Sequence, residues 1–255
     1  MSEIKVLAFD LYGTILDTSS TDRKLKEIFP SSESSKVHHV VQQWRRYQLE
    51  YTWRLNSMGA YKSFDEVTYL SLSHAAKESG ISLSKEQLEE VVASYNTLSP
   101  YPDAVKLFQE LPGHIKALVF SNGTPRMLSD TFSASEFLKD VKYLSVDSAK
   151  CFKPDPRTYQ LLVQHHNMEG EAINASEVYL VSGNPFDIVG AAAAGLGTIW
   201  IDRAGKGWQD GVKENQQVQV ETLAAVEDKD IGHKIEILKF LYLIKSLSWF
   251  NLMYK

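Results

Sequence analysis

The sequence predicts an α/β protein in which a parallel sheet carries helices on both faces and an all-helical segment is inserted after the first strand. Short apolar runs rich in β-branched residues lie at 4–9, 115–120, 178–181 and 198–201. Each run ends in a polar or glycine-containing turn, and helical periodicity or a loop follows it, not the two-residue turn of a hairpin. Apolar strands that alternate with helices are typical of a parallel sheet buried on both faces, so we expect a Rossmann-like core.

The segment between the first and second strands is expected to be entirely helical. Apolar residues follow helical spacing over 37–55, which predicts a long amphipathic helix. A second helix is predicted over 64–77, and a third begins at the capping box that Ser84 opens. The predicted domains are a core at 1–16 and 100–230 and a helical cap at 17–99, placed over the carboxyl edge of the sheet.

Composition excludes several classes of function. Among 255 residues the formal net charge is −5, and no local block of Lys and Arg offsets it, so we expect no nucleic-acid partner. One cysteine, Cys151, excludes an intramolecular disulfide framework and favours a reducing compartment. The first residues carry no apolar stretch of signal-peptide length, so a cytoplasmic location is expected. Histidine pairs at 38–39 and 165–166 lack the spacing of zinc ligands, and we predict no metal or cofactor.

The first strand ends in the segment Asp10-Leu11-Tyr12-Gly13-Thr14. A carboxylate at the end of a buried strand is costly unless it is paired or functional. Gly13 allows a sharp backbone turn, and Thr14 offers a hydroxyl near the same point. Taken alone, Asp10 fits a simple turn-capping residue equally well. The other strand ends therefore decide between the two interpretations.

Polar groups also gather at the later strand ends and loops. Ser121 and Asn122 follow the second apolar run, and their hydroxyl, amide and backbone N–H groups suit an anion. Lys153 precedes a turn, and the loop at 182–187 brings hydroxyl, amide and carboxylate groups to the start of a helix. As a set in this chain order, the motifs over residues 4–225 resemble the haloacid dehalogenase superfamily, whose nucleophile is the first Asp of the opening strand.

Two departures from the phosphatases of that superfamily point to its L-2-haloacid dehalogenase branch. Tyr12 stands where phosphatases carry an acid-catalysing Asp, and a tyrosine is a poor general acid near neutral pH. Phosphatases also pair acids in the last motif for Mg²⁺, whereas here Asn184 takes one of those places and Asp187 is the remaining carboxylate. The segment Trp44-Arg45-Arg46-Tyr47-Gln48-Leu49-Glu50-Tyr51 is similar to the branch's W-R-x-x-Q-L-E-Y, a match that makes Arg45 the residue that receives the halide.

The resemblance implies a two-step, metal-independent hydrolysis of short L-2-haloacids to D-2-hydroxyacids. Ionised Asp10 would displace the halide to form an aspartyl ester, with Lys153 keeping it charged. Water positioned by Asp187, with Asn184 and Ser182, would then hydrolyse that ester. Arg45 would stabilise the leaving halide, unless it forms a solvated surface pair with Arg46. The residues that the resemblance assigns to holding or orienting the substrate are Tyr12, Thr14, Leu49, Phe64, Ser121, Asn122, Tyr159, Ser182, Asn184 and Phe186.

These substrate-holding residues differ in their implied roles. The pair at 121–122 would bind the substrate carboxylate, while Leu49, Phe64 and Phe186 would form an apolar wall that excludes water from the nucleophile. Ordinary core packing is an equally good interpretation of the two phenylalanines. Gly183 and Phe186 stand where Ser and Trp are common in the family, so the resemblance does not fix the size of the pocket or the positioning of the water.

Two other functions are kept as alternatives: a Mg²⁺-dependent phosphatase of the same superfamily and a non-catalytic interaction module. Tyr12 and Asn184 argue against the phosphatase, and the intact set of charged residues argues against the module. The small-molecule substrate is the expected partner, with a homodimer left open. Residues 231–255 form an apolar extension that we predict to be helical and outside the catalytic site; its lysines make membrane insertion costly, and docking on the protein body, a second subunit or a membrane surface all stay open.

Overall fold

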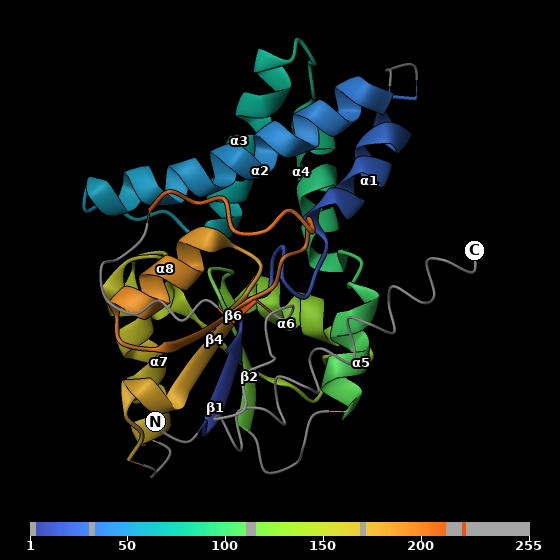
Figure 1. Ribbon diagram of the computed structural model, residues 1–255. Helices are drawn as coiled ribbons and strands as arrows, with labels where there is room; N and C mark the ends of the chain where they lie inside the picture. Colours follow the sequence, from blue (N-terminus) through green and yellow to red (C-terminus); the bar gives the residue numbers. More distant parts are fainter. Residues whose placement is uncertain (1–3, 31–33, 111–115, 169–171, 213–220, 223–255) are drawn as a thin grey trace.

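The computed structural model describes residues 4–30, 34–110, 116–168, 172–212 and 221–222. Within these residues the centre is a six-stranded parallel sheet in the order β3-β2-β1-β4-β5-β6 (Figure 1). The strands are β1 (Val6–Phe9), β2 (Lys116–Ser121), β3 (Lys142–Ser145), β4 (Val178–Ser182), β5 (Gly197–Trp200) and β6 (Glu221–Thr222). The predicted α/β class with a parallel sheet is confirmed.

Helices cover both faces of this sheet. α5 (Pro102–Glu110) and α6 (Pro125–Ser133) lie on one side, and α7 (Pro156–Met168) and α8 (Pro185–Ala193) lie on the other (Figure 1). The chain therefore leaves the neighbouring strands β1 and β4 toward opposite faces, which makes the crevice at their carboxyl ends the topological switch point of the sheet. Every residue of these two strands is buried. Polar residues that follow them therefore meet where open α/β sheets bind ligands.

The segment between β1 and α5 is helical. It contains α1 (Thr21–Ile28), α2 (Ser34–Ser57), α3 (Phe64–Glu78) and α4 (Lys85–Ala93), gathered at the end of the sheet where the strands terminate (Figure 1). α4 begins at the expected capping box, since Ser84 and Gln87 exchange side chain-to-backbone hydrogen bonds of 3.2 and 2.9 Å. The segment that leads from the sheet into these helices lies beside the segment that returns to it, because the Asp17 N–H donates to the Ser99 carbonyl at 2.8 Å.

Two elements escape sequence prediction for lack of apolar residues. β3 exposes its first two residues and buries only its last, so it carries no apolar run. α1 buries only Thr21 and Leu25, too few positions to show helical periodicity. A 3₁₀ helix (Ser94–Thr97), in which Tyr95 is buried, follows α4. The predicted helical extension at 231–255 lies outside the described residues, and none of the helices described is both long and apolar enough to span a membrane.

Candidate active site

The carboxylate of Asp10 lies just beyond β1 and is almost fully buried. Its backbone N–H donates to the carbonyl of Val181 at 2.9 Å, so the residue leaves the sheet directly beside the end of β4. One carboxylate oxygen accepts hydrogen bonds from the Thr14 hydroxyl at 2.6 Å and from Asn184 Nδ2 at 2.7 Å, and the other accepts from Lys153 Nζ at 3.2 Å. These donors come from three separate parts of the chain, which favours the functional interpretation of Asp10 over a turn cap.

Lys153 lies between two buried carboxylates. Its ammonium is 1% exposed and donates to Asp10 and, at 2.9 Å, to Asp187, whose side chain is fully buried at the first turn of α8. A third hydrogen bond, of 2.7 Å, reaches the carbonyl of Phe120 at the end of β2. The Lys153 ammonium thus pairs with two carboxylates that water hardly reaches. Each of these buried carboxylates therefore has a cationic partner.

The environment of Asp187 suits a general base. Burial raises the pKa of its carboxyl above the ordinary value, the Lys153 ammonium opposes that rise, and the Asp10 carboxylate adds to it. The Tyr159 hydroxyl donates to Asp187 at 2.8 Å and stabilises the ionised form. A carboxylate with a raised pKa accepts a proton from water more readily than an ordinary one does.

Arg45 reaches the same site from α2. Its guanidinium donates to the carbonyl of Tyr12 at 3.1 Å, to Asn184 Oδ1 at 3.3 Å and to Gln48 Oε1 at 2.7 Å. Asn184 in turn donates to Asp10, so one amide separates the permanent cation from the buried carboxylate. Arg46, by contrast, is exposed. The structure therefore separates the two adjacent arginines, and they do not form a solvated surface pair.

The predicted site residues Ser121, Asn122 and Ser182 cluster around Lys153 and the loop after β4. The Lys153 backbone N–H donates to Asn122 Oδ1 at 3.0 Å, and the Ser121 hydroxyl accepts from the N–H of Gly123, two residues later, at 3.1 Å. Ser182 accepts from the N–H of Asn184 at 3.1 Å and so shapes the loop that carries this amide. The structure brings all three to the end of the sheet where Asp10 lies.

Gly183 has a steric reason to be glycine. A β-carbon at this position would lie 2.6 Å from the carbonyl oxygen of Gly13. The Gly183 N–H donates to the Thr14 hydroxyl at 2.9 Å, so the β1 and β4 loops are drawn together at this point. The close approach leaves no room for the Ser that is common in the family at this position.

The predicted apolar residues take different positions. Phe64, at the start of α3, is buried and stacks on the Tyr12 ring with centroids 5.7 Å apart. Phe186 and Leu49 are half-buried, and Phe186 meets the edge of Trp53 on α2 at 5.4 Å. Burial raises the pKa of the Tyr12 phenol, which keeps it neutral and a poor proton donor. Tyr12 thus contributes an apolar surface and a backbone carbonyl to the site.

Two residues of the site, Gln48 and Arg203, received no role in the sequence prediction of function. Gln48 is fully buried on α2, accepts from Arg45 and from Tyr95, and donates to Thr68, so it orients the guanidinium. Arg203, after β5, donates to the carbonyl of Thr14 at 2.5 and 3.2 Å. A polar residue inside the apolar stripe of α2 is a signal that was present for Gln48. No such signal exists for Arg203.

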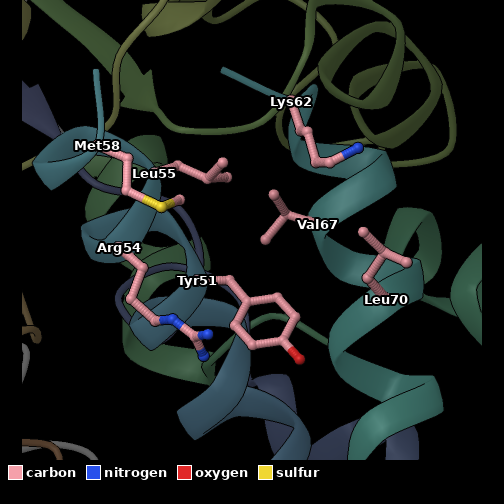
Figure 2. Close-up of a pocket in the computed structure, with 7 residues that line it drawn as sticks. All are labelled: Tyr51, Arg54, Leu55, Met58, Lys62, Val67 and Leu70. Atoms are coloured by element: carbon pink, nitrogen blue, oxygen red, sulfur yellow. The ribbon is translucent and has the colours of Figure 1, made fainter. Parts of the chain in front are cut away.

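A separate hollow lies within the helical segment. Figure 2 shows it between α2 and α3, where it has a volume of about 170 Å³. Its lining residues are Tyr51, Arg54, Leu55, Met58, Lys62, Val67 and Leu70. None of the predicted site residues contributes to this lining, so the hollow is distinct from the site around Asp10.

The chain is similar to known proteins over most of its length. A family model described as haloacid dehalogenase-like hydrolase matches residues 4–195. An (S)-2-haloacid dehalogenase of Pseudomonas sp. (strain YL) is 31% identical over 89% of this chain and 94% of its own, and one of Xanthobacter autotrophicus is 34% identical over 78% and 76%. The structure of the L-2-haloacid dehalogenase from Xanthobacter autotrophicus with chloropropionic acid covalently bound superposes with a TM-score of 0.71, at 31% identity over 80% of this chain and 79% of that one.

Proposed function

Because the chain belongs to the haloacid dehalogenase-like hydrolase family, we propose that it hydrolyses short (S)-2-haloacids to (R)-2-hydroxyacids through an ester on Asp10. Relatives that cover most of this chain are named (S)-2-haloacid dehalogenases, and that activity is brought here from them. One observation of this chain carries the proposal. A buried carboxylate, Asp10, faces a permanent cation, Arg45, across a single amide that bonds both.

In the first step, Asp10 attacks C2 of the substrate and the carbon–halogen bond breaks. The hydrogen bonds from Thr14, Asn184 and Lys153 hold the attacking carboxylate in one orientation. A bound substrate therefore meets a carboxylate oxygen that is already oriented for attack on C2. The departing halide gains negative charge, and Arg45 stabilises it because a guanidinium is always charged and weakly hydrated.

The substrate carboxylate needs donors at the end of β2. Ser121 and Asn122 supply them at the end of β2, where the Ser121 hydroxyl accepts a hydrogen bond of 3.1 Å from the Gly123 N–H and keeps its own proton to donate. Leu49, Phe64 and Phe186 enclose the apolar part of the substrate and limit the access of water to Asp10. In this proposal residues 17–99 act as the cap that supplies Arg45, Leu49 and Phe64.

In the second step, water hydrolyses the ester. Asp187 takes a proton from the water as the water oxygen attacks the carbonyl carbon of the Asp10 ester. The ester C–O bond then breaks, the departing alkoxide takes that proton from Asp187 to become the hydroxyacid, and the Asp10 carboxylate is regenerated as its own proton passes to solvent. Lys153 and Tyr159 hold Asp187 in place. Ser182 shapes the loop that presents Asn184 on the other side of Asp10. No metal enters either step, and the cytoplasm is the expected compartment.

Halide release from the separate enantiomers of 2-chloropropionate tests the proposal. We expect release from the (S) enantiomer alone, unchanged by EDTA, and none from Asp10→Asn, because a neutral amide is a poor nucleophile. In a single turnover in H₂¹⁸O, the label should enter the Asp10 carboxylate before it enters product. Label found only in the product would mean that water attacks the substrate directly. Hydrolysis of p-nitrophenyl phosphate that requires Mg²⁺, without halide release, would establish the phosphatase alternative instead.

A further inference from the structure

A second polar residue of α2, Asn56, is hydrogen-bonded to the segment that carries Lys153. Asn56, in the last turn of α2, donates from Nδ2 to the carbonyl of Phe152 at 2.6 Å. The Phe152 N–H donates back to Asn56 Oδ1 at 2.9 Å. The side-chain amide of Asn56 therefore uses both its N–H donor and its oxygen acceptor to bind the backbone of one residue, which lies 96 positions away in the chain. Such a two-point contact fixes orientation as well as distance.

Phe152 directly precedes Lys153, and the contacts around it leave little freedom. Its side chain is fully buried, stacked on Tyr61 with centroids 5.3 Å apart and tilted against Phe64 at 6.0 Å. On its other side, the Lys153 N–H is bonded to Asn122 at 3.0 Å. The backbone at 152–153 is therefore held from α2 on one side and from the end of β2 on the other.

Arg45 and Asn56 lie on the same face of α2. They are 11 residues apart, and three turns of an α-helix take about 11 residues and span about 16 Å. Between them on this face, Gln48 and Thr52 are fully buried. α2 therefore meets the end of the sheet at two points, with Arg45 at the loops after β1 and β4 and Asn56 at the loop before α7.

We propose that Asn56 is a positioning residue that sets Lys153, through Phe152, at a fixed place relative to Arg45 on the same helix. The inference rests on the proposed function, because that function assigns halide departure to Arg45 and the two carboxylates to Lys153. The physical consequence is coupling between two parts of the site. When Asn56 holds Phe152, the halide-binding cation and the cation shared by Asp10 and Asp187 move as one body with α2.

The groups that face the Lys153 ammonium determine what a loss of Asn56 does. They are Asp10 after β1, the Phe120 carbonyl and ring at β2, and Asp187 on α8, which Tyr159 of α7 contacts. Lys153 opposes the rise that burial causes in the pKa of Asp187. If the backbone at 152–153 loosens, this opposition weakens and Asp187 holds its proton to a higher pH. A general base that is protonated is inactive. As pH is lowered, the variant should therefore lose activity at a higher pH than the wild type does.

Asn56→Ala and Asn96→Ala form a matched pair of variants. Asn96 also joins the helical segment to the sheet region, through a 3.2 Å hydrogen bond to Asp130 on α6, but it touches no group of the site. For Asn56→Ala we expect kcat to fall about tenfold with a smaller change in KM, since two hydrogen bonds are removed. We expect the acid limb of the kcat profile to move up by about one pH unit. Asn96→Ala should leave kcat and the acid limb as in the wild type.

A second readout does not depend on turnover. The ¹³C resonance of the Asp187 carboxyl, followed by NMR across pH, should titrate at a higher pH in Asn56→Ala than in the wild type and in Asn96→Ala. A folded Asn56→Ala protein with a wild-type titration of Asp187 would overturn the proposal. Asn56→Ser, which retains a polar group, takes the place of the alanine variant if that variant does not fold. Absence of halide release by the wild type would refute the proposed function alone, because the NMR titration still decides the role of Asn56.

Discussion

Lys153→Met removes the cation that two buried carboxylates share. Methionine has a similar length and keeps the apolar contact with the Phe120 ring, over which the Lys153 ammonium lies at 4.4 Å. The variant loses hydrogen bonds of 3.2 Å to Asp10, 2.9 Å to Asp187 and 2.7 Å to the Phe120 carbonyl. Asp10 and Asp187 then lie close together in an almost water-free site without a counter-charge.

The expected cost at neutral pH is large. Removal of one partner from a buried ion pair lowers the free energy of unfolding by about 3–5 kcal/mol, because the other charge stays buried without compensation. Lys150→Met is the matched control three residues earlier. Its ion pair with Asp147, at 2.8 Å, involves an exposed ammonium, and such surface pairs contribute about 0–1 kcal/mol.

The cost should depend on pH with a definite sign. The pKa of Asp187 is raised in the folded protein, so its protonated form adds stability at low pH, and this contribution is lost as pH rises through the folded pKa. Without Lys153 the pKa rises further and the loss extends to higher pH. The difference in stability between wild type and Lys153→Met should therefore be smallest near pH 4, about the ordinary pKa of Asp, and should grow toward neutral pH.

Urea unfolding of the wild type, Lys153→Met and Lys150→Met, at a series of pH values from acid to neutral, measures this difference. The reasoning predicts a penalty for Lys153→Met that widens with pH and a penalty for Lys150→Met that stays small throughout. A penalty for Lys153→Met that is equal at all pH values would refute it, since the carboxylates would then not be the source of the cost.

Three further predictions test other contacts of the site. Arg45→Lys should lower kcat at least about tenfold, because a lysine reproduces neither the planar set of donors of a guanidinium nor its weak hydration. The loss should be larger for chloride than for bromide substrates, because chloride is the poorer leaving group. Equal losses for the two halides in halide-release assays would contradict this role. Tyr159→Phe removes the 2.8 Å hydrogen bond that favours ionised Asp187, so the acid limb of the kcat profile should move to higher pH, and an unmoved limb would show that Asp187 is not the titrating base. Gly183→Ala places a carbon 2.6 Å from the Gly13 carbonyl and should lower the free energy of unfolding by about 1–3 kcal/mol, whereas Gly211→Ala, with nothing within 4 Å, should change it little in the same urea experiment.

The charged centre of the site was accessible from the sequence because it follows a topological rule. Asp10, Ser121 and Ser182 each end a predicted strand, and the carboxyl ends of parallel strands lie at one edge of the sheet. Lys153 was less accessible by this rule, since it follows no strand directly. It was found through the family resemblance, and the structure places its ammonium between the two carboxylates.

Contacts made by side chains of ordinary type escaped prediction. Gln48 stands in the segment that is similar to W-R-x-x-Q-L-E-Y, but nothing in that segment indicated that it would orient Arg45. Arg203 and Asn56 carry no motif, and both act on backbone carbonyls, Thr14 and Phe152, that any residue type could supply. A sequence pattern cannot indicate such acceptors, because the identity of the residue that offers the carbonyl is irrelevant to the bond.

The sequence by itself determined the strands that build the sheet, the long helix α2 and the residue types that gather at the carboxyl edge. These features follow from short-range causes: apolar periodicity, capping chemistry and turn residues within a few positions of one another. Only the tertiary structure decided that α2 reaches the loops after β1 and β4 with Arg45 and the loop before α7 with Asn56. Those contacts join positions 33, 139 and 96 residues apart, so they depend on how the whole chain packs, and local preference contains no information about that packing.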